Sequence, residues 1–556
     1  MSENGTEQFR IIPLGGLGEI GLNMMVFEQD DDLMVIDCGL MFPGDSMPGV
    51  DYVIPDFTYI LENSSRLRGV VLTHGHEDHI GGLPFLLSQI SAPVYGTPLT
   101  LGLVRQKLIE YGLESDADLR TVEAGQSFEL GPFEIDFIRV SHSIADCVAL
   151  AVKTAAGYVI HSGDFKLDPT PIDGKRVDLS AFSRYGEMGV TALLSDSTNV
   201  EREGYTLSEA EVGKALSDVF REIEGRIIVA TFASNIHRIQ QVLQMTEKYG
   251  RKAVLMGRSM VGNTRIAREL GYLSVSDDVL VEPEALKHIP DDKVVLLTTG
   301  TQGEMLSGLS RMARDEHKHI KIKPGDTVVM SSRFIPGNER AIDYLINEFY
   351  RRGAEVIYEK VSDIHVSGHA SQEELKLLLS ITKPQYFIPV HGEFRHLVKH
   401  SQLAEKMGVP RERVLIAEDG DIITIGDVGG EKLGKIEAGR QVVDGTWVGD
   451  SKDMVLQERR KLASDGVLIA VAILDMESGE LHGPIRLESH GFLYEEEEEG
   501  VLERARKYAE EELMGHPLER RTDKDAFAQD MRASLKRYIK KNIMRFPAII
   551  PVVIET

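Results

Sequence analysis

Short apolar runs separated by Gly, Pro and Asp dominate residues 9–199 of the chain. Examples are FRIIPLGG, LMVIDCGL, GVVLTHGH, FEIDFIRVSH and ALLSDST. Runs of this length, rich in β-branched residues and bounded by such breakers, predict β-strands. Several of them end in His or Asp. We therefore expect polar side chains to gather along one edge of a sheet, where loops usually carry the chemistry.

The pattern changes between residues 201 and 352, where amphipathic helices alternate with apolar strands. Residues 208–223, SEAEVGKALSDVFREI, have helical spacing, with Ser208 at the N-cap and Glu211 three residues later. Apolar runs such as GRIIVATFA and KVVLLTTG lie between the helices, which predicts a parallel α/β domain. The earlier pattern returns afterwards, so we interpret 201–352 as an insertion into a domain formed by 8–200 and 353–447.

The end of the chain predicts a helical linker over 448–463 and a small α+β domain over 464–556. Strands GVLIAVAIL and AIIPVVIE flank a helix-rich stretch. Residues 530–546, DMRASLKRYIKKNIMRF, form an amphipathic and basic helix, for which we expect core packing with a solvated basic face. A dimer or tetramer contact through this domain is a hypothesis.

Length and composition narrow the class of protein. A chain of 556 residues exceeds one hydrophobic core, so two or three domains are expected. Two cysteines, no bilayer-length apolar run and no export signal favour a cytoplasmic protein without a membrane segment. The formal net charge of −26 argues against generic polyanion binding. A nucleic-acid substrate would have to be bound locally, by metal ions, helix N-termini and a few arginines.

The stretch THGHEDHIGG concentrates potential metal ligands. His74 and His76 can converge on one cation, whereas Asp78 and His79 can reach a second. Imidazole and carboxylate ligands suit zinc or manganese. Because four such groups would repel or desolvate one another without a cation, they predict a dinuclear metal site.

Three further candidates each follow an apolar run: His142 in VSHSIADC, Asp164 in HSGDF and His391 in PVHGE. Asp164 could bridge two ions, since a carboxylate offers two oxygens. For His142 or His391 alone, a hydrogen-bonded histidine at a loop end is the alternative. Two neighbouring divalent ions can acidify a bridging water and offset developing negative charge.

THGHEDHIGG resembles the signature of the metallo-β-lactamase fold, an αββα sandwich of two mixed sheets with metal ions at its edge. The resemblance implies two Zn²⁺ per subunit, with Mn²⁺ or Mg²⁺ as alternatives. It assigns three histidines to one ion, an aspartate and two histidines to the other, and one aspartate to both: His74, His76 and His142; Asp78, His79 and His391; Asp164. It also matches Asp37, in MVIDCG, to an aspartate that supports the metal-binding loop. An ordinary turn residue is the alternative for Asp37.

Three additions to this fold indicate a nucleic acid as substrate, which the fold alone could not decide. The inserted block resembles the β-CASP domain of nucleic-acid-processing members. LLSDST would supply their acidic motif at Asp196, and HVSGHAS their histidine motif at His369. The segments PLGGLGEIGLNMM, TFASNIHRIQQ, TTGTQGE, SSRFIPGNE and HVSGHAS look like bacterial ribonuclease J, a resemblance that covers nearly the whole chain, including the linker and the small C-terminal α+β domain.

The resemblance implies a 5′-to-3′ exoribonuclease and endoribonuclease acting on single-stranded RNA in mRNA decay and rRNA maturation. A metal-bridging hydroxide would attack phosphorus, with Asp78 orienting it or accepting its proton. His369, poised by Asp196, would stabilise or protonate the leaving 3′ oxygen. The alternative for His369 is a structural role in its loop. A homodimer or homotetramer and partners in an RNA-degradation complex are further expectations.

Two segments are candidates for binding RNA phosphates. One is a glycine-containing loop that precedes a helix, and the other, followed by His237 and Arg238, begins a helix after a strand. Their residues are His365, Val366, Ser367, Gly368 and His369 in the first, and Ala233, Ser234 and Asn235 in the second. Taken alone, the sequence ASN would be an ordinary N-cap. An anion pocket one nucleotide from the metal ions would favour a 5′-monophosphate.

Hard oxygen donors suggest one structural Ca²⁺, as some family members have. They are the Gly49 carbonyl, Asp51 and Asp444, and two ordinary acidic turns are the alternative.

Other functions compete with the ribonuclease. A small-molecule hydrolase, such as a lactonase or a glyoxalase-type thioesterase, would not need the 201–352 insertion or HVSGHAS. A scaffold without activity would be expected to lose metal ligands. Relatives that process DNA or pre-mRNA 3′ ends stay open, because no 2′-hydroxyl reader is evident in the sequence.

Overall fold

A computed structural model describes residues 9–556 except 45–46, 303, 305–306, 333–337, 359–363, 427–428, 446, 451–453 and 494. Parts of the segments TTGTQGE and SSRFIPGNE therefore lie outside the described residues. The chain divides into two compact units. One comprises Met1–Met41 and Ile54–Gly439, and the other Phe42–Val53 and Arg440–Thr556.

Two mixed β-sheets form the larger part of the first unit. The eight-stranded sheet has the order β22 (Gly429–Lys435), β21 (Asp421–Gly426), β1 (Phe9–Gly15), β3 (Met24–Gln29), β4 (Asp32–Ile36), β6 (Leu67–Val71), β7 (Val94–Gly96) and β8 (Leu119–Thr121). The six-stranded sheet has the order β19 (Tyr386–Val390), β13 (Val190–Asp196), β12 (Gly157–His161), β11 (Val148–Thr154), β10 (Phe133–Arg139) and β9 (Ser127–Leu130). A short parallel pair, β2 (Leu17–Gly18) and β20 (Gly392–Glu393), lies beside them.

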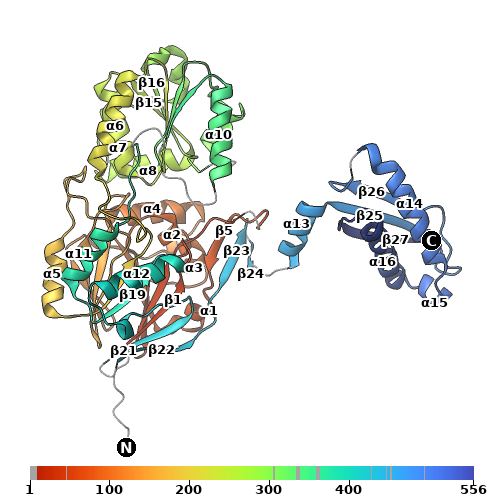
Figure 1. Cartoon of the computed structure of the whole chain (residues 1–556), viewed down its shortest axis with the longest axis horizontal. Helices are drawn as coiled ribbons and strands as arrows, with labels where there is room; N and C mark the ends of the chain where they lie inside the picture. The colour runs from red at the N-terminus through yellow and green to blue at the C-terminus, as the bar shows by residue number, and fades with distance from the viewer. Residues whose placement is uncertain are drawn as a thin grey trace, which may run out of the picture. The chain divides into compact units, whose positions relative to one another are not determined.

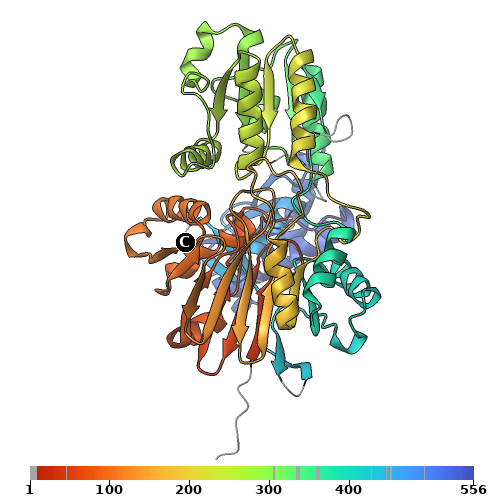
Figure 2. The ribbon, with the colours of Figure 1, turned by 90° about the vertical axis from the view of Figure 1, so that its left-hand side faces the viewer.

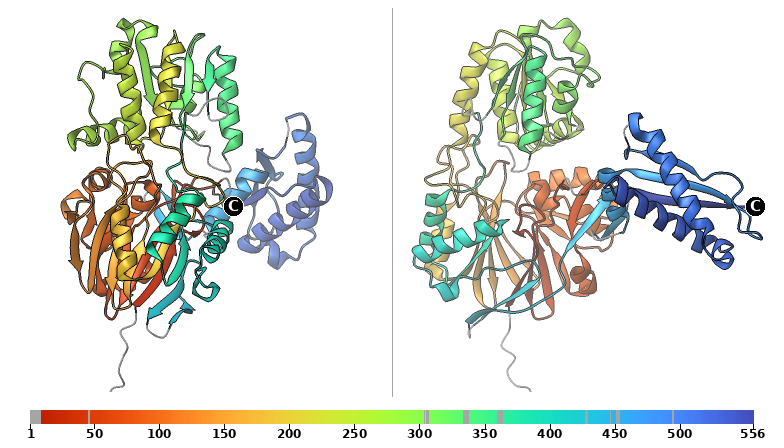
Figure 3. Two further views of the ribbon diagram at one scale, coloured as in Figure 1. Left: turned by 60° about the vertical axis from the view of Figure 1, so that its left-hand side comes forward. Right: turned by 45° about the vertical axis from the view of Figure 1, so that its right-hand side comes forward.

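The hydrophobic core lies between these sheets. Phe27 and Ile36 of the eight-stranded sheet belong to one buried cluster with Phe137 and Leu150 of the six-stranded sheet. Helices α5 (Leu179–Met188), α11 (Gln372–Thr382) and α12 (Phe394–Lys406) form an outer layer next to β19, which Figure 3 shows. Helix α4 (Pro98–Glu110), which follows α1 (Thr58–Glu62), α2 (Glu77–Ile80) and α3 (Leu83–Leu87), contacts β7 and β8. The expected αββα sandwich is confirmed.

A parallel five-stranded sheet forms the expected inserted α/β domain. Its order is β15 (Lys252–Met256), β16 (Val294–Thr298), β14 (Ile227–Ala230), β17 (Thr327–Met330) and β18 (Glu355–Ile357). Its helices are α6 (Glu209–Glu222), α7 (Ile236–Lys248), α8 (Arg258–Glu269), α9 (Gly308–Ala313) and α10 (Glu339–Arg351). Helices flank the sheet on both sides, with α6 and α7 opposite α10 (Figures 1 and 2). Strands covered on both faces read as continuous apolar runs, which is why the pattern predicted them.

The inserted sheet extends past the expected limit at residue 352. Strand β18, in the sequence EVIYEK, pairs in parallel with β17 rather than with a strand of the sandwich. A short apolar edge strand carries no signal for which sheet it joins, because that depends on packing. The other domain limits stay predictions.

The second unit contains two small sheets. One has the order β24 (Trp447–Asp450), β23 (Arg440–Asp444) and β5 (Tyr52–Pro55), of which Tyr52 and Val53 belong to this unit. The other has the order β26 (Arg486–His490), β25 (Val467–Leu474) and β27 (Ala548–Glu555), with helices α13 (Met454–Asp465), α14 (Glu495–Met514), α15 (Leu518–Arg521) and α16 (Lys524–Asn542). Phe527, Met531 and Leu535 of α16 are buried in this core, so the basic face of the helix remains at the surface. Among the described residues, no helix has the length and apolarity needed to cross a bilayer.

Candidate active site

Parallel strands deliver the candidate residues to one edge of the sandwich. Strands β12, β13 and β19 are parallel neighbours, and Asp164, Asp196 and His391 lie at or just after their carboxyl ends. In the other sheet, β4 and β6 are parallel, and they are followed by Asp37 and by the segment that begins at Thr73. Because carboxyl ends of parallel strands meet at the same edge, residues remote in the sequence become neighbours.

Three histidines form the first group of possible metal ligands. Nε2 of His74 lies 3.0 Å from Nδ1 of His76, which lies 3.2 Å from Nε2 of His142. Nδ1 of His142 donates to the Gly368 carbonyl at 2.7 Å, which leaves a lone pair on its Nε2. Burial lowers the pKa of all three rings, that of His76 to about 4. They are therefore neutral, as metal ligands must be.

Two aspartates and two histidines form the second group. Asp164 Oδ2 lies 3.3 Å from His79 Nε2, and Asp164 Oδ1 lies 3.4 Å from His391 Nδ1. Asp78 Oδ2 lies 3.4 Å from His391 Nε2. Asp164 Oδ2 is also 3.8 Å from Nε2 of both His74 and His142, so this carboxylate stands between the two groups. That is the position expected of a bridging ligand.

The donor set fits divalent cations. In each group, one ligand atom from every residue lies within 4.8 Å of the others. A proton on His76 Nδ1 can serve only one of its two facing nitrogens, whereas a cation accepts all three lone pairs. In the second group, burial disfavours charge, but Asp164 and its neighbours raise the pKa of His391 to about 10. Clustered carboxylates thus require positive charge, which protons supply when no divalent ion is bound.

Asp37 supports the metal-binding segment. Its carboxylate accepts hydrogen bonds from Thr73 N and Thr73 Oγ1, both at 2.8 Å, and contacts His79 Nδ1 at 2.7 Å. Although burial opposes protonation, Asp164, Asp78 and Asp37 raise the pKa of His79 well above its usual value. The contact orients the His79 ring so that Nε2 faces Asp164. These contacts are compatible with the supporting role predicted for Asp37, which stays a prediction.

A hydrogen-bonded acid–base pair flanks the two groups. His369 Nδ1 lies 2.8 Å from Asp196 Oδ2 and 3.9 Å from Asp164 Oδ2. The Asp196 side chain is buried, whereas one-fifth of the His369 side chain is exposed, so the ring has an open side. Burial disfavours the cation, but Asp196 raises the pKa of His369 above its usual value.

The predicted phosphate-binding loop, His365–His369, contacts His142 of the first group of possible metal ligands. A Cβ on Gly368 would lie 2.6 Å from His142 ring atoms, so glycine permits the close approach that lets its carbonyl accept from His142. Val366 and Ser367 are buried, and Ser367 Oγ accepts from His369 N at 3.2 Å. The glycine thus brings the backbone close to a histidine, a role that the sequence did not indicate. Phosphate binding by His365–His369 stays a prediction.

The second predicted phosphate segment begins α7. Asn235 is the N-cap, and its side chain accepts from Arg238 N at 3.0 Å, which is the ordinary role considered for ASN. Ala233 and Ser234, which precede it, are half-buried. Arg238, fully buried, donates to the carbonyl of Ile364 at 2.6 Å, directly before His365. Arg238 therefore joins the two predicted phosphate segments.

The residues expected to bind calcium already have protein partners. Gly49 O accepts from Arg459 Nη1 at 3.3 Å, and Asp444 Oδ2 lies 2.6 Å from Arg459 Nη2. Asp51 Oδ2 accepts from Gly445 N at 2.8 Å. A guanidinium thus occupies the space between two of the three expected donors, and these contacts do not favour a cation there. The calcium site stays a prediction.

Several supporting residues were missed by sequence reasoning. Asn23 Nδ2 donates to Asp78 O at 3.1 Å, and Thr198 Oγ1 contacts both Asp196 Oδ1 at 2.7 Å and His391 Nδ1 at 2.8 Å. Asn199 Nδ2 donates to His369 O at 3.0 Å. The only signal was proximity to a motif, as in GLNMM and LLSDSTN, because uncharged side chains of this kind are common in any loop.

Four known family models match most of this chain. Their descriptions are beta-lactamase superfamily domain (35–180), ribonuclease J beta-CASP domain (224–349), Zn-dependent metallo-hydrolase RNA specificity domain (353–416) and ribonuclease J C-terminal domain (454–556). Ribonuclease J of Thermus thermophilus is 45% identical over 99% of this chain and 96% of that relative. Ribonuclease J2 of Bacillus subtilis is 40% identical over 100% of both. A crystal structure of a protein of unknown function from Enterococcus faecalis shares the fold, with a TM-score of 0.52 and 15% identity over 75% of this chain and 100% of that one.

Proposed function

Since this chain belongs to the ribonuclease J family of metal-dependent ribonucleases, we propose that it degrades single-stranded RNA from a 5′-monophosphorylated end and also cuts RNA internally. The observation that carries the proposal is the position of Asp164, between two groups of metal ligands and 3.9 Å from His369. An acid–base group this close to a dinuclear centre suits hydrolysis of a phosphodiester.

In the proposed mechanism, each group of ligands would hold one zinc ion, and Asp164 would contribute an oxygen to both. When bound, two divalent ions offset the charge that develops on phosphate oxygens and acidify water. Asp78, with three-tenths of its side chain exposed, orients the attacking water and accepts its proton. His369 donates a proton to the leaving 3′ oxygen from its open side. Asp196 holds Nδ1 of His369 and thereby aims the other ring nitrogen away from the buried carboxylates.

The 5′ preference is assigned to the two segments that Arg238 joins. Ala233–Asn235 and His365–His369 lie before the N-termini of α7 and α11, which favour anions. In a chain with a net charge of −26, such local sites are the means to bind RNA. The proposed setting is cytoplasmic mRNA decay and rRNA maturation, and free buried thiols at Cys38 and Cys147 suit a reducing compartment.

The test compares RNA carrying a 5′-monophosphate with the same RNA carrying a 5′-triphosphate. We expect wild type to release mononucleotides rapidly only from the monophosphate, and Asp78→Ala to release none. Equal digestion of both RNAs would remove the 5′ preference. Hydrolysis of a lactone but not of RNA would instead favour a small-molecule hydrolase, and equal cleavage of matched DNA would remove the RNA specificity.

Metal identity and assembly need separate measurements. Elemental analysis of freshly purified protein should find two zinc ions per chain, and manganese or magnesium in their place would revise the metal. A homodimer or homotetramer through the C-terminal domain, and partners in an RNA-degradation complex, stay proposals. Sedimentation of a chain cut after Asp450 tests the first, since an unchanged assembly state would remove it.

A further inference from the structure

One buried carboxylate, that of Glu374, belongs neither to the metal ligands nor to the acid–base pair. Glu374 is the third residue of α11 and is fully buried. With Ser371 it completes a capping box, in which Glu374 Oε2 accepts a hydrogen bond from Ser371 N at 2.8 Å. A capping box requires only this local bond from its carboxylate. Glu374 accepts two more, from segments that are remote in the sequence.

The additional donors are the backbone N–H groups of Leu167 and Thr206. Glu374 Oε1 accepts from Leu167 N at 2.7 Å, and Oε2 accepts from Thr206 N at 2.8 Å. A buried carboxylate is costly unless hydrogen bonds satisfy its oxygens. Three N–H groups satisfy this one, so three separate segments converge on a single side chain.

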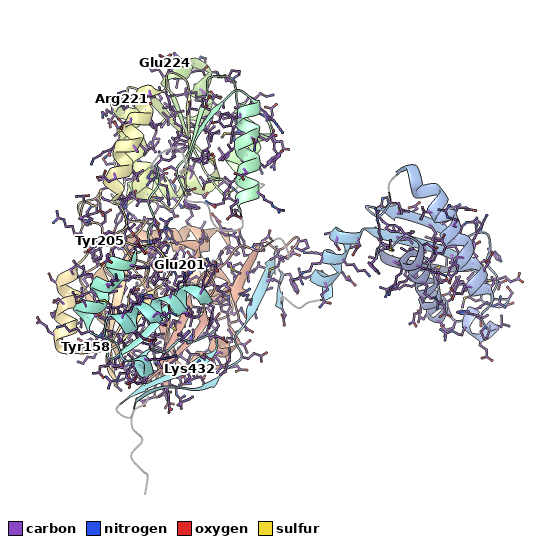
Figure 4. All side chains as sticks on the ribbon, in the orientation of Figure 1. Tyr158, Glu201, Tyr205, Arg221, Glu224 and Lys432 are labelled. Carbon is purple, nitrogen blue, oxygen red and sulfur yellow. The ribbon has the colours of Figure 1, made fainter. Side chains whose placement is uncertain are left out.

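Two of these segments continue directly into the candidate active site, and the third is hydrogen-bonded to it. Leu167 lies three residues after Asp164, and Ser371 lies two residues after His369. Thr206 reaches the same histidine through its side chain, since its Oγ1 donates to His369 O at 2.8 Å. In Figure 4 the neighbouring Tyr205 is labelled where the loop between β13 and α6 meets the sandwich. The Glu374 carboxylate thus ties the turn carrying Asp164 to the loop carrying His369.

We propose that Glu374 is a positioning residue that sets the separation of Asp164 and His369, 3.9 Å between Oδ2 and Nδ1. The inference rests on the proposed function, because it makes Glu374 responsible for holding the bridging carboxylate and the proton donor in one arrangement. The hydrogen bonds to the Glu374 carboxylate come from backbone N–H groups, so Glu374 acts through the backbone of these segments.

Replacement of Glu374 by Gln separates this role from simple packing. Gln has the same size but offers one acceptor oxygen and one NH₂ donor. The amide oxygen takes the place of Oε2, which accepts two bonds, so the NH₂ faces the N–H of Leu167. Two donors repel each other, so the turn that carries Asp164 is released. Glu373→Gln is the matched control, since Glu373 precedes it on the same helix and pairs with Lys376 near the surface at 2.6 Å.

The primary measurement is the affinity of the metal-free protein for Mn²⁺, by calorimetric titration in the absence of RNA. We expect Glu374→Gln to weaken binding by about 10-fold or more, the range for groups that orient metal ligands. Glu373→Gln should stay within about 2-fold of wild type, as surface substitutions do. Equal affinities in the two variants would overturn the proposal. Failure of wild type to cleave RNA would instead overturn the proposed function, because the affinity comparison does not depend on RNA.

A second variant tests the His369 side of the arrangement. Thr206→Val removes the hydroxyl that donates to His369 O but keeps the N–H that Glu374 accepts. We expect slower turnover of 5′-monophosphorylated RNA with unchanged Mn²⁺ affinity, and unchanged turnover would overturn this half of the proposal. Hydrogen exchange of wild type needs no variant. The amides of Leu167, Thr206 and Ser371 should exchange slowly, and exchange as fast as in exposed loops would overturn the inference even if Glu374→Gln did not fold.

Discussion

Asp37, directly after β4, lies beside His79 of helix α2, with Asp37 Oδ2 2.7 Å from His79 Nδ1. Asp37 has a φ of +59°, a left-handed conformation that a non-glycine residue adopts only when its surroundings hold it. The bonds from Thr73 provide that support. The Asp37 carboxylate thus fixes the orientation of His79, a candidate metal ligand, and the start of the segment that also carries His74, His76 and Asp78.

Asp37→Ala should therefore weaken metal binding without removing a metal ligand. We expect Mn²⁺ affinity to fall about 10- to 100-fold, because the His79 ring loses the partner that sets its orientation. Calorimetric titration of metal-free protein measures the change. Asp32→Ala is the control, since Asp32 begins the strand that ends directly before Asp37 but pairs with Arg68 at the surface. An Asp37→Ala protein with wild-type affinity would contradict the assigned role.

His369→Ala tests the proton donor. If His369 protonates the leaving oxygen, turnover of 5′-monophosphorylated RNA should fall by about 10²- to 10⁴-fold. Mn²⁺ affinity should change far less than in Asp37→Ala, which separates a role in chemistry from a role in metal binding. The control is His319→Ala, an exposed histidine of the inserted domain. Full turnover by His369→Ala would leave only the structural role in its loop.

Chelation should lower both activity and stability. Ions that bind only the folded chain stabilise it by about 4 kcal/mol at 1,000 times the dissociation constant. We therefore expect a lower melting temperature and no RNA cleavage in chelator, with both restored by added Zn²⁺ or Mn²⁺. Thermal unfolding followed by circular dichroism, with parallel RNA digestion, measures this. Full ribonucleolytic turnover in chelator would contradict a metal-dependent mechanism.

The buried pair of Glu209 and Arg238 should make stability depend on pH. Glu209 Oε2 lies 2.7 Å from Arg238 Nη2. Lys166 Nζ also contacts the Glu209 carboxylate, and the backbone N–H of Glu209 donates to Asp168 Oδ2. Burial alone would raise the pKa of Glu209, but Arg238 and then Lys166 lower it from 4.5 to about 2. The ionised carboxylate therefore stabilises the fold above pH 4.5, and this contribution is lost as the pH falls toward 2.

Glu209→Gln should accordingly cost about 3–5 kcal/mol of unfolding free energy at pH 7, because it leaves a buried guanidinium unpaired. The difference from wild type should shrink as the pH falls from 4.5 toward 2, because Glu209 then becomes protonated in the unfolded chain first, which lowers the wild-type free energy of unfolding. Urea denaturation between pH 7 and pH 3 measures it. Glu211→Gln is the control, since Glu211 forms an exposed pair with Lys214. A difference that does not vary with pH would contradict the assigned pair.

The sequence by itself determined the fold class, the family and the candidate metal ligands. Those residues lie at the ends of apolar runs, and THGHEDHIGG packs four of them into one short segment. Local patterns of this kind can be recognised without knowledge of the fold, because strand periodicity and ligand chemistry are properties of neighbouring residues. Continuous apolar runs likewise predicted the inserted parallel sheet, whose strands are covered on both faces.

Apart from Asp37, only the tertiary structure decided which residues support that chemistry. It placed the Gly368 carbonyl within hydrogen-bonding distance of His142, which is 226 positions away in the sequence. It also placed β18 in the inserted sheet. It further placed Leu167 and Thr206 against Glu374, a residue that no motif in the sequence analysis singled out. A hydrogen bond between distant segments depends on how strands and loops pack in three dimensions, and neither residue type nor spacing along the chain encodes it.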